Sequence, residues 1–305
     1  MPNNIYYKQA ELLLRVLPVI MRVDAFALKG GTAINFFWRE YPRLSVDIDL
    51  TYIKVKPRDE SLFEISDALK SIESDLKKIF RGIEIVPKLN KGNNLAHGLT
   101  IKYNEATIKV EVNTVIRGTV YPVVEKKLCN KAEQEFELSV TARTLSLEDL
   151  YGGKICAALD RQHPRDLFDI KLLFENEGLT DKIRQAFIVY LISHNRPIVE
   201  LLNPGLLDIS IVFQKEFQGM TREEVNLDSL LSIRTELIKR IKTDLTDDEI
   251  KFLLSFKNKT PNWKLLGIKD IENLPAVKYK LFNLRQMKPE KHQQAYKKLE
   301  EYLIR

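Results

Sequence analysis

Residues 45–53, SVDIDLTYI, alternate apolar and polar side chains with the period of a β-strand. Successive side chains of a strand point to opposite faces, so residues two apart share a face. The apolar residues then enter the core while Asp47 and Asp49 project together from the other face. Two carboxylates held that close repel each other unless a proton or a cation lies between them. The alternative is an edge strand with a solvated acidic face, and the surrounding residues must decide.

A glycine pair precedes the two aspartates, with one predicted helix between them. Gly30 and Gly31 lead directly into that helix, TAINFFWRE, so backbone N–H groups and the helix start can cradle a triphosphate. Thr32 can add its hydroxyl and Lys29 a charge. Glycine pairs often only turn the chain, but the order of glycines, helix and paired aspartates favours phosphate binding.

A third acid lies on a later predicted strand, TIKVEVNTV, residues 107–115. Glu111 shares a strand face with Lys109 and Asn113. Taken alone, it is explained by a solvent-facing carboxylate. Beside Asp47 and Asp49 it would complete an oxygen-rich site for Mg²⁺, which favours a few carboxylates plus substrate phosphates.

The chain changes character near residue 145. Its 305 residues are long enough for about two domains. Residues 1–145 mix predicted helices with strands, including a hairpin that turns at Asn104-Glu105 and a strand EFELSV at 135–140. Residues 146–305 read as almost entirely helical, with caps at SLED (146–149) and TDDE (246–249). We therefore predict an α/β N-terminal domain with a mixed sheet, followed by a helical domain.

Composition excludes several classes of protein. No apolar run approaches the roughly 20 residues of a membrane span, and the N-terminus lacks a signal-peptide pattern. Cys129 and Cys156 are the only cysteines, which gives neither a disulfide framework nor a cysteine zinc site. We expect a cytoplasmic protein without a membrane partner. The net charge of +6 mildly favours an anionic partner.

A second motif, EDLYGGKICAALDRQHPRDLFDI, spans residues 148–170. It predicts two helices broken near His163-Pro164, because proline disfavours helix in the residue before it and suits a first turn. Helical spacing places Lys154 on one face with Arg161, and Asp166 on one face with Asp169. The alternative to a functional role is a salt-bridge network of Arg161 or Arg165 with an aspartate that fixes the two helices.

Together these segments resemble a known family. Gly-Gly, a helix, D-x-D on a strand and a later acid are similar to the DNA polymerase β-like nucleotidyltransferase superfamily. More narrowly, LKGGTAINFFWREYPRLSVDIDL and EDLYGGKICAALDRQHPRDLFDI resemble the AbiEii/AbiGii (MenT-like) toxin family of nucleotidyltransferases, over roughly residues 10–175. The family has K-G-G-T-A…R-x-S-x-D-I-D-L, then a lysine and R-x-x-x-R-D-x-x-D.

The resemblance implies roles for these residues. Asp47 and Asp49 would be catalytic and would hold Mg²⁺ or Mn²⁺. Glu111 stands at the third metal position, where the family usually has Asp. Lys154 would contact nucleotide phosphates, and Asp169 or Asp166 would assist catalysis.

The NTP-binding residues implied by the resemblance lie around the first motif. They are Lys29, Gly30, Gly31, Thr32, Arg43 and Ser45. Arg43 would pair with the triphosphate, although a loop arginine is usually only solvated. The Ser45 hydroxyl would meet the γ-phosphate or accept a nucleotide or phosphate, and the alternative is a strand-start serine.

The resemblance implies a toxin that blocks translation. It would transfer NMP from an NTP to an RNA end, most plausibly the tRNA 3′ acceptor end, and would be paired with a cognate antitoxin. A second interpretation keeps the chemistry but has a protein or a small molecule such as an antibiotic as acceptor. A third is a non-catalytic nucleotide-binding module. Intact Asp47, Asp49 and Lys154 argue against the third.

The C-terminal tail, residues 278–305, contains eight Lys or Arg against three Glu, which gives 8 − 3 = +5. Four aromatic residues, Tyr279, Phe282, Tyr296 and Tyr302, lie among these charges. Such a helical surface can follow an RNA backbone, with phosphate contacts from Lys288, Lys291, Lys297 and Lys298. An amphipathic helix that packs its aromatics inward explains the same pattern.

Overall fold

The computed structural model describes residues 5–304. Two compact units divide the chain: the first contains Met1–Leu150 and Gly219–Glu223, and the second contains Tyr151–Gln218 and Glu224–Arg305. The predicted division lies between residues 145 and 146. The return segment, Gly219–Glu223, was not predicted: it belongs to the first unit although helical segments of the second precede and follow it.

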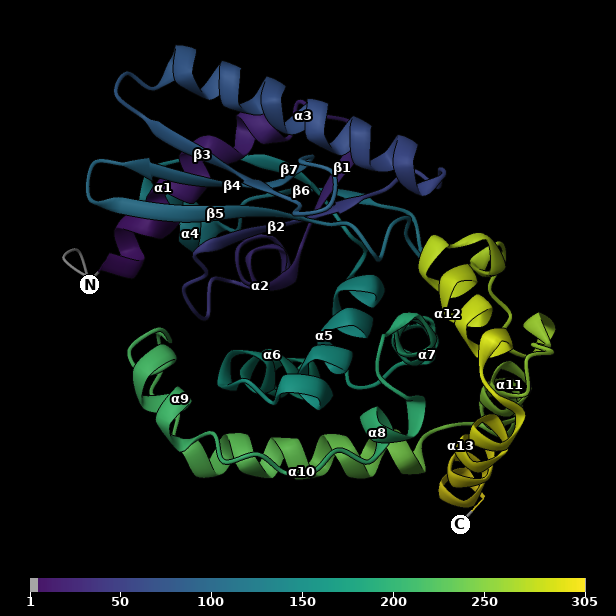
Figure 1. The fold of residues 1–305 in the computed structure, drawn as a ribbon. Helices are drawn as coiled ribbons and strands as arrows, with labels where there is room; N and C mark the ends of the chain where they lie inside the picture. The colour runs from purple at the N-terminus through teal and green to yellow at the C-terminus, as the bar shows by residue number, and fades with distance from the viewer. Residues whose placement is uncertain (1–4, 305) are drawn as a thin grey trace. The chain divides into compact units, whose positions relative to one another are not determined.

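A mixed sheet lies at the centre of the first unit, with the strand order β3-β4-β5-β2-β1-β7-β6 (Figure 1). β2 pairs with β5 in parallel and β1 with β7 in parallel, and the other neighbours are antiparallel. The predicted α/β fold with a mixed sheet is confirmed. The strands are β1 (Phe26–Lys29), β2 (Asp47–Tyr52), β3 (Glu84–Leu89), β4 (Ala96–Tyr103), β5 (Ala106–Asn113), β6 (Val124–Lys127) and β7 (Thr141–Thr144).

One face of this sheet is covered by two helices, α1 (Ile5–Ile20) and α3 (Arg58–Ile79). The Tyr52 hydroxyl of β2 donates to Glu64 of α3 at 2.6 Å, so α3 lies on the face to which Tyr52 points. Because alternate residues share a face, Ile48 and Leu50 point the same way, and both are fully buried. The odd-numbered residues of β2 therefore face away from α3.

The predicted hairpin is confirmed, and one predicted strand is wrong. β4 and β5 pair in antiparallel fashion from Tyr103 and Ala106 outward, and Asn104 in the turn has φ 53°. The segment 135–140 is not a strand, because α4 (Asn130–Phe136) occupies its start. The helix places Phe136 in an aromatic cluster, with its ring centroid 4.8 Å from that of Tyr7. This tertiary packing overrides the local β pattern.

The helix after the glycines is confirmed in an unusual form. α2 (Gly30–Ala33) continues into a π-helix, η1 (Ile34–Trp38). π-helical turns are rare and occur frequently at functional sites. Trp38 ends the π-helix with its indole N–H donating to Thr144 at 3.0 Å and with the Lys126 ammonium 4.0 Å from its ring centroid. These contacts anchor the helix to β6 and β7.

The regular elements of the second unit are all helices within its described residues, as predicted. Its helices are α5 (Leu147–Arg161), which begins in the first unit, α6 (Pro164–Glu175), α7 (Asp181–Ser193), α8 (Ile198–Leu202), α9 (Ser210–Glu216), α10 (Leu227–Thr243), α11 (Asp247–Lys257), α12 (Pro275–Gln286) and α13 (Pro289–Leu303). Two 3₁₀ turns, η2 (Trp263–Leu265) and η3 (Ile271–Asn273), precede α12. No helix within residues 5–304 combines the length and apolar character needed to cross a membrane.

Both predicted N-terminal caps are present. The backbone N–H of Asp149 donates to Ser146 Oγ at 3.1 Å, and Thr246 and Glu249 form a reciprocal capping box at the start of α11.

α5 and α7 pack closely because Gly152 has no side chain. A Cβ there would lie 2.9 Å from the backbone of Ala186.

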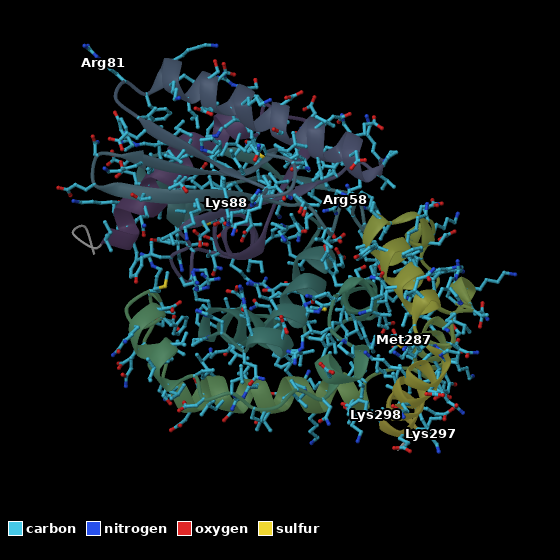
Figure 2. All side chains as sticks on the ribbon, in the orientation of Figure 1. Arg58, Arg81, Lys88, Met287, Lys297 and Lys298 are labelled. Carbon is cyan, nitrogen blue, oxygen red and sulfur yellow. The ribbon has the colours of Figure 1, made fainter. Side chains whose placement is uncertain are left out.

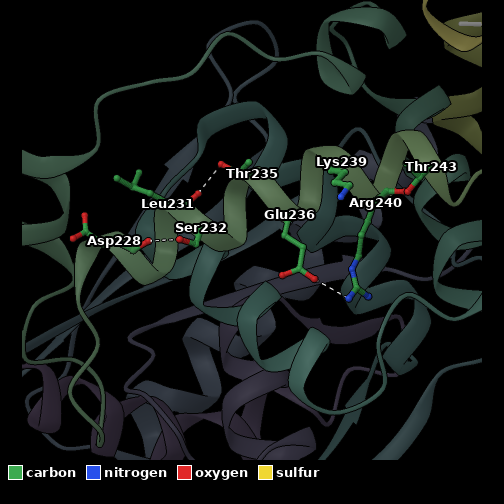
Figure 3. A pocket seen from close by; sticks show the side chains of 8 residues that line it. All are labelled: Asp228, Leu231, Ser232, Thr235, Glu236, Lys239, Arg240 and Thr243. Carbon is green, nitrogen blue, oxygen red and sulfur yellow. Dashed lines mark hydrogen bonds and ion pairs between the residues drawn. The ribbon is translucent and has the colours of Figure 1, made fainter.

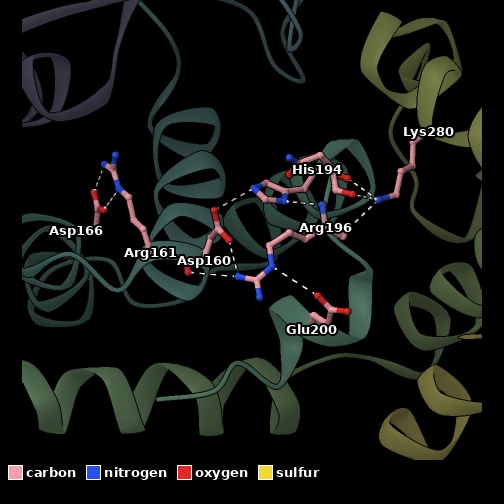
Figure 4. Close-up of polar contacts among 8 residues, drawn as sticks. Asp160, Arg161, Asp166, His194, Arg196, Glu200 and Lys280 are labelled. Carbon is pink, nitrogen blue, oxygen red and sulfur yellow. Dashed lines mark hydrogen bonds and ion pairs between the residues drawn. The ribbon is translucent and has the colours of Figure 1, made fainter. Parts of the chain in front are cut away.

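A polar network holds α12 against the end of α7 (Figure 4). The Lys280 ammonium donates to the carbonyl oxygens of His194 and Arg196, at 2.5 and 2.7 Å. Burial, with a smaller effect from the Lys257 charge, lowers the pKa of Lys280 to about 8. Arg196 in turn pairs with Asp160 of α5 at 2.7 Å. The network satisfies backbone carbonyl groups at the end of α7.

Candidate active site

Gly30 lies directly against one of the two predicted catalytic aspartates. Its φ is +71°, and a Cβ at this position would lie 2.5 Å from Oδ2 of Asp49. Neighbouring Lys29 is the β1 register partner of Asp49. Only glycine combines the left-handed backbone with the space that the carboxylate needs. The glycine turn and the D-x-D strand are thus one packed structure.

Gly31 lies in the same way against Arg43 and Ser45. A Cβ at Gly31 would lie 2.5 Å from a terminal nitrogen of Arg43 and 3.2 Å from Ser45 Oγ. Arg43 is 2% exposed, and its other terminal nitrogen donates to the Leu44 carbonyl at 2.9 Å. The solvated loop arginine considered from sequence is therefore wrong. Arg43 is a buried charge that forms one wall of the glycine turn.

Thr32 and Ser45 form a buried hydroxyl pair. Thr32 Oγ1 lies 2.6 Å from the carbonyl oxygen of Asp47 and 2.9 Å from Ser45 Oγ. A threonine hydroxyl has a single hydrogen. The shorter contact identifies the Asp47 carbonyl as its acceptor, so the Ser45 hydroxyl donates back to Thr32. These bonds fix the entrance to β2, where the chain turns toward the aspartates.

Asp47 and Asp49 lie together on the face of β2 that α3 does not cover. Both are half-buried, and they alternate with the fully buried Ile48 and Leu50. β2 is a central strand with β1 and β5 on its two sides, so the alternative of a solvated edge strand is wrong. A central strand places the pair at a defined position on a rigid sheet, as a catalytic pair requires.

Glu111 is in register with Asp49 on the neighbouring strand β5. Its carboxylate accepts from the Lys88 ammonium at 2.7 Å. That hydrogen bond lowers the pKa of Glu111 although partial burial acts to raise it. Within residues 5–304, no three His, Cys, Asp or Glu side chains are gathered in a way that could hold a metal ion. Glu111 as a third metal ligand stays a prediction.

The donor chemistry of the pair nevertheless fits a hard divalent cation. Asp47 and Asp49 supply carboxylate oxygens from one strand face, and Gly30 leaves the second carboxylate uncovered by a side chain. Mg²⁺ is usually held by one or two carboxylates together with substrate phosphates. Two aspartates are therefore sufficient protein ligands for such an ion.

The second predicted motif forms a buried charge cluster within the second unit. Lys154 of α5 lies 2.8 Å from an oxygen of Asp166 and 2.9 Å from an oxygen of Asp169, both on α6. The two carboxylate side chains are fully buried, and that of Lys154 is 7% exposed. The helix break that brings them together is as predicted. Pro164 is the first residue of α6, and the His163 ring accepts from the Arg165 N–H.

Asp166 has a second cationic partner. The Arg161 guanidinium donates to both of its oxygens, at 2.6 and 3.0 Å (Figure 4). Burial alone would raise the pKa of Asp166, but Lys154 and Arg161 outweigh it and hold this pKa far below its ordinary value. Asp166 thus remains ionised and belongs to the salt-bridge network that was the structural alternative for this motif. A catalytic role for Lys154, Asp166 or Asp169 stays a prediction.

Sequence reasoning missed the return segment of the first unit. Residues 42–44 form an antiparallel bridge with residues 220–222, through Leu44 N–H to the Met220 carbonyl at 2.8 Å and Arg222 N–H to the Pro42 carbonyl at 3.0 Å. Met220 is 2% exposed. Arg222 lies over the ring of Tyr41 and pairs with Glu135. The segment thus holds the backbone on both sides of Arg43, and no local pattern marks it.

The C-terminal tail consists of α12 and α13, and its aromatics divide between surface and interior. Tyr279 and Phe282 on α12 are 63% and 57% exposed, whereas the Tyr302 hydroxyl donates to the Leu202 carbonyl at 2.7 Å. The inward-packed alternative therefore holds for Tyr302 and not for the α12 pair. The four predicted RNA-contacting lysines are all exposed: Lys288, Lys291, Lys297 and Lys298. Figure 2 labels Lys297 and Lys298.

A shallow groove on α10 contains none of the predicted site residues (Figure 3). One helix alone lines it, and two of its lining residues, Glu236 and Arg240, are occupied in an ion pair at 2.7 Å. Ligand sites are usually concave, mostly apolar pockets with a few precisely placed polar groups, which this polar helix surface is not. The sheet face at Asp47 and Asp49 therefore remains the candidate active site.

Comparison with known proteins identifies the family of the chain. The profile of the nucleotidyl transferase AbiEii toxin family, of type IV toxin–antitoxin systems, matches residues 12–278. The structure is similar to that of MenT4, nucleotidyltransferase toxin Rv2826c from Mycobacterium tuberculosis H37Rv. That protein is 16% identical, with a TM-score of 0.60 over 92% of this chain and 93% of the other. At this identity the likeness shows the fold alone. No curated protein sequence matches.

The family match covers both motifs and most of the helical region. The chain belongs to the AbiEii family of nucleotidyltransferase toxins.

Proposed function

We propose that this nucleotidyltransferase moves a nucleoside monophosphate from an NTP to the 3′ end of an RNA, with the tRNA acceptor end as the substrate. The packing of Gly30 against the Asp49 carboxylate carries the proposal, because it joins a glycine turn suited to phosphates to a carboxylate pair suited to a metal. The family implies a cognate antitoxin, and transfer to the acceptor end would block translation.

The reaction is a displacement at phosphorus. The RNA 3′-hydroxyl oxygen attacks the α-phosphorus, the bond from that phosphorus to the bridging oxygen breaks, and pyrophosphate leaves with the electron pair. The hydroxyl proton passes to a carboxylate oxygen of the aspartate pair. Asp47 and Asp49 would hold a divalent cation, Mg²⁺ or Mn²⁺, which when bound supplies positive charge at the attacking and leaving oxygens.

The glycine turn and its neighbours have supporting roles in this proposal. The backbone N–H groups of Gly30 and Gly31 would bind phosphate oxygens, with Lys29 adding charge. Thr32 and Ser45 hold the start of β2 through their hydroxyl pair. Arg43 is buried behind Gly31, which suits a positioning role for the turn better than a swinging contact with the triphosphate.

Labelled nucleotide transfer tests the proposal. The protein is incubated with each α-³²P-labelled NTP, Mg²⁺ or Mn²⁺, and total RNA, and the products are separated on a denaturing gel. We expect label on RNA of tRNA length, lost on periodate treatment of the 3′ ends beforehand. Asp47→Asn and Asp49→Asn should abolish labelling and leave the melting temperature nearly unchanged, because both carboxylates remain partly exposed to solvent and such groups contribute little net stability. Equal activity in these variants would contradict the proposal.

The proposed RNA acceptor has two alternatives, a protein and a small molecule. Label on protein or on a small molecule, with none on RNA, would establish the alternative acceptors while keeping the chemistry. RNA binding itself is measured by filter retention across a salt series. Changing Lys288, Lys291, Lys297 and Lys298 to Glu should reduce affinity and flatten the salt slope if the tail contacts phosphates. An unaltered slope would remove the tail from the RNA site.

A further inference from the structure

A row of charged residues crosses the sheet on the face that carries Asp47 and Asp49. Residues opposite each other on neighbouring strands share a face. In register from β3 through β4, β5 and β2 to β1, the row reads Lys88, Gly98, Glu111, Asp49 and Lys29. A lysine therefore stands at each end, and two acids stand side by side within it.

Gly98 leaves a gap in this row. A Cβ at that position would lie 2.6 Å from the Val110 carbonyl oxygen, so no side chain fits there. The Lys88 side chain extends from the edge strand across the gap, and its ammonium reaches Glu111 at 2.7 Å. A residue two strands away from Glu111 thus becomes its ion-pair partner.

The pairing affects the electrostatics of the candidate metal site. Asp49 and Glu111 are register partners, and two neighbouring carboxylates repel each other unless a positive charge neutralises one. The Lys88 ammonium supplies that charge from the side away from Asp49. A divalent cation at the aspartate pair would draw on the same Glu111 carboxylate, so the ammonium and the cation compete for it.

We propose that Lys88 is a positioning residue whose ammonium holds Glu111 in a lysine pair in the metal-free protein and competes with the divalent cation for that carboxylate. The inference rests on the proposed function, because it requires the cation to bind at Asp47 and Asp49. In this arrangement the ion pair with Lys88 withholds Glu111 from the metal, so Glu111 is not a permanent third ligand. The affinity of the site for the metal is lower as a result.

A second lysine pair on the same face is a matched control. Lys102 of β4 pairs with its register partner Glu84 of β3 at 3.5 Å. Its other register partner is Thr107 of β5, so no acid of the candidate site lies in that row. Lys102 is 57% exposed at its side chain and Lys88 is 55% exposed. The two lysines differ mainly in whether an active-site carboxylate is the partner.

Binding of Mn²⁺ without nucleotide, followed by the electron paramagnetic resonance signal of the free ion, tests the proposal. Lys88→Met should tighten Mn²⁺ binding about two- to fivefold, the range expected when an exposed ion pair no longer competes. Lys102→Met should leave the dissociation constant unchanged. In a Glu111→Gln background, Lys88→Met should have no effect, because the contested carboxylate is gone. Matching thermal unfolding curves would show that the variants fold alike.

The outcomes separate this inference from the proposed function. Unchanged or weaker Mn²⁺ binding in Lys88→Met, with binding lost in Asp49→Asn, would overturn the inference alone. Mn²⁺ binding that Asp49→Asn leaves intact would place the cation elsewhere and overturn the proposed function together with the inference. An equal increase in Mn²⁺ affinity in Lys102→Met would show that the change in net surface charge causes the effect, and would also contradict the inference.

Discussion

Gly30 has no room for a side chain because Oδ2 of Asp49 occupies the space that a Cβ would take, at 2.5 Å. The contact links the left-handed backbone of Gly30 to the position of a carboxylate that we propose to be catalytic. If Gly30 changes, the carboxylate must move or the turn must open. The role of the glycine turn can therefore be tested by substituting Gly30 while both aspartates are kept.

Gly30→Ala should abolish nucleotide transfer and cost about 1–2 kcal/mol of unfolding free energy, the usual penalty for a left-handed alanine. Gly82→Ala is the matched control. Gly82 has φ +83° in the same unit, and nothing lies within 4 Å of a Cβ built there. It should lose similar stability and keep its activity. Comparable activity in both variants would show that Asp49 does not depend on the turn.

A buried ion cluster makes a different prediction for Lys154. Lys154→Met leaves two fully buried carboxylates, Asp166 and Asp169, without their shared cation. Removing one partner of a buried pair typically costs about 3–5 kcal/mol. Chemical denaturation should show this loss. Lys171→Met, which breaks an exposed pair with Glu175 on α6, should change the unfolding free energy by less than about 0.5 kcal/mol.

Lys154→Arg separates the structural role of this cluster from a catalytic one, because it keeps the charge. If it retains stability and lowers kcat/KM for NTP with RNA binding intact, Lys154 also acts on the nucleotide, as the family pattern implies. Wild-type kinetics in a stable Lys154→Arg protein would make the cluster purely structural. Wild-type stability in Lys154→Met would contradict the structural reading.

The lowered pKa of Asp166 predicts that the free energy of unfolding decreases at acid pH. Its pKa in the folded protein lies below the ordinary value of 3.8, so the unfolded chain binds this proton more readily. The stabilisation is therefore complete above about pH 4 and is lost as the pH falls toward the folded pKa. Urea unfolding between pH 3 and pH 6 should show an extra slope of up to about 1.4 kcal/mol per pH unit. Asp166→Asn should lack it, and parallel curves for the two proteins would refute the assignment.

Local pattern predicted the parts of the site that lie close together along the chain. The alternation around Asp47 and Asp49 predicted their common face, and the Pro164 break predicted the two helices on which Arg161 and Asp166 lie. The pairing of Lys154 with Asp166 and Asp169 was not predicted. The partner of Glu111 was not foreseen, because Lys88 reaches it only through sheet register and the gap at Gly98. Such pairings depend on strand order, which a single sequence does not contain.

The local sequence pattern also failed to predict the burial of Arg43 and the helix at the start of residues 135–140. A loop arginine is usually solvated, yet Arg43 is enclosed by Gly31 and by the return segment of the chain. The segment 135–140 has a strand-like pattern, but the aromatic cluster around Phe136 favours a helix at its start. In both cases the deciding contacts come from residues distant in sequence.

The return segment offers the last test, since it holds the backbone beside Arg43 through hydrogen bonds. Arg222→Pro removes the N–H that donates to the Pro42 carbonyl. Loosening that bridge should raise KM for NTP, because Arg43 and Ser45 lose their support behind the glycine turn. Arg222→Ala is the control: it keeps the N–H but deletes the contacts with Tyr41 and Glu135. Equilibrium binding of a non-hydrolysable NTP analogue should weaken in the proline variant and change little in the alanine variant. Equal affinity in both would show that the segment supports the fold of the first unit without positioning its active site.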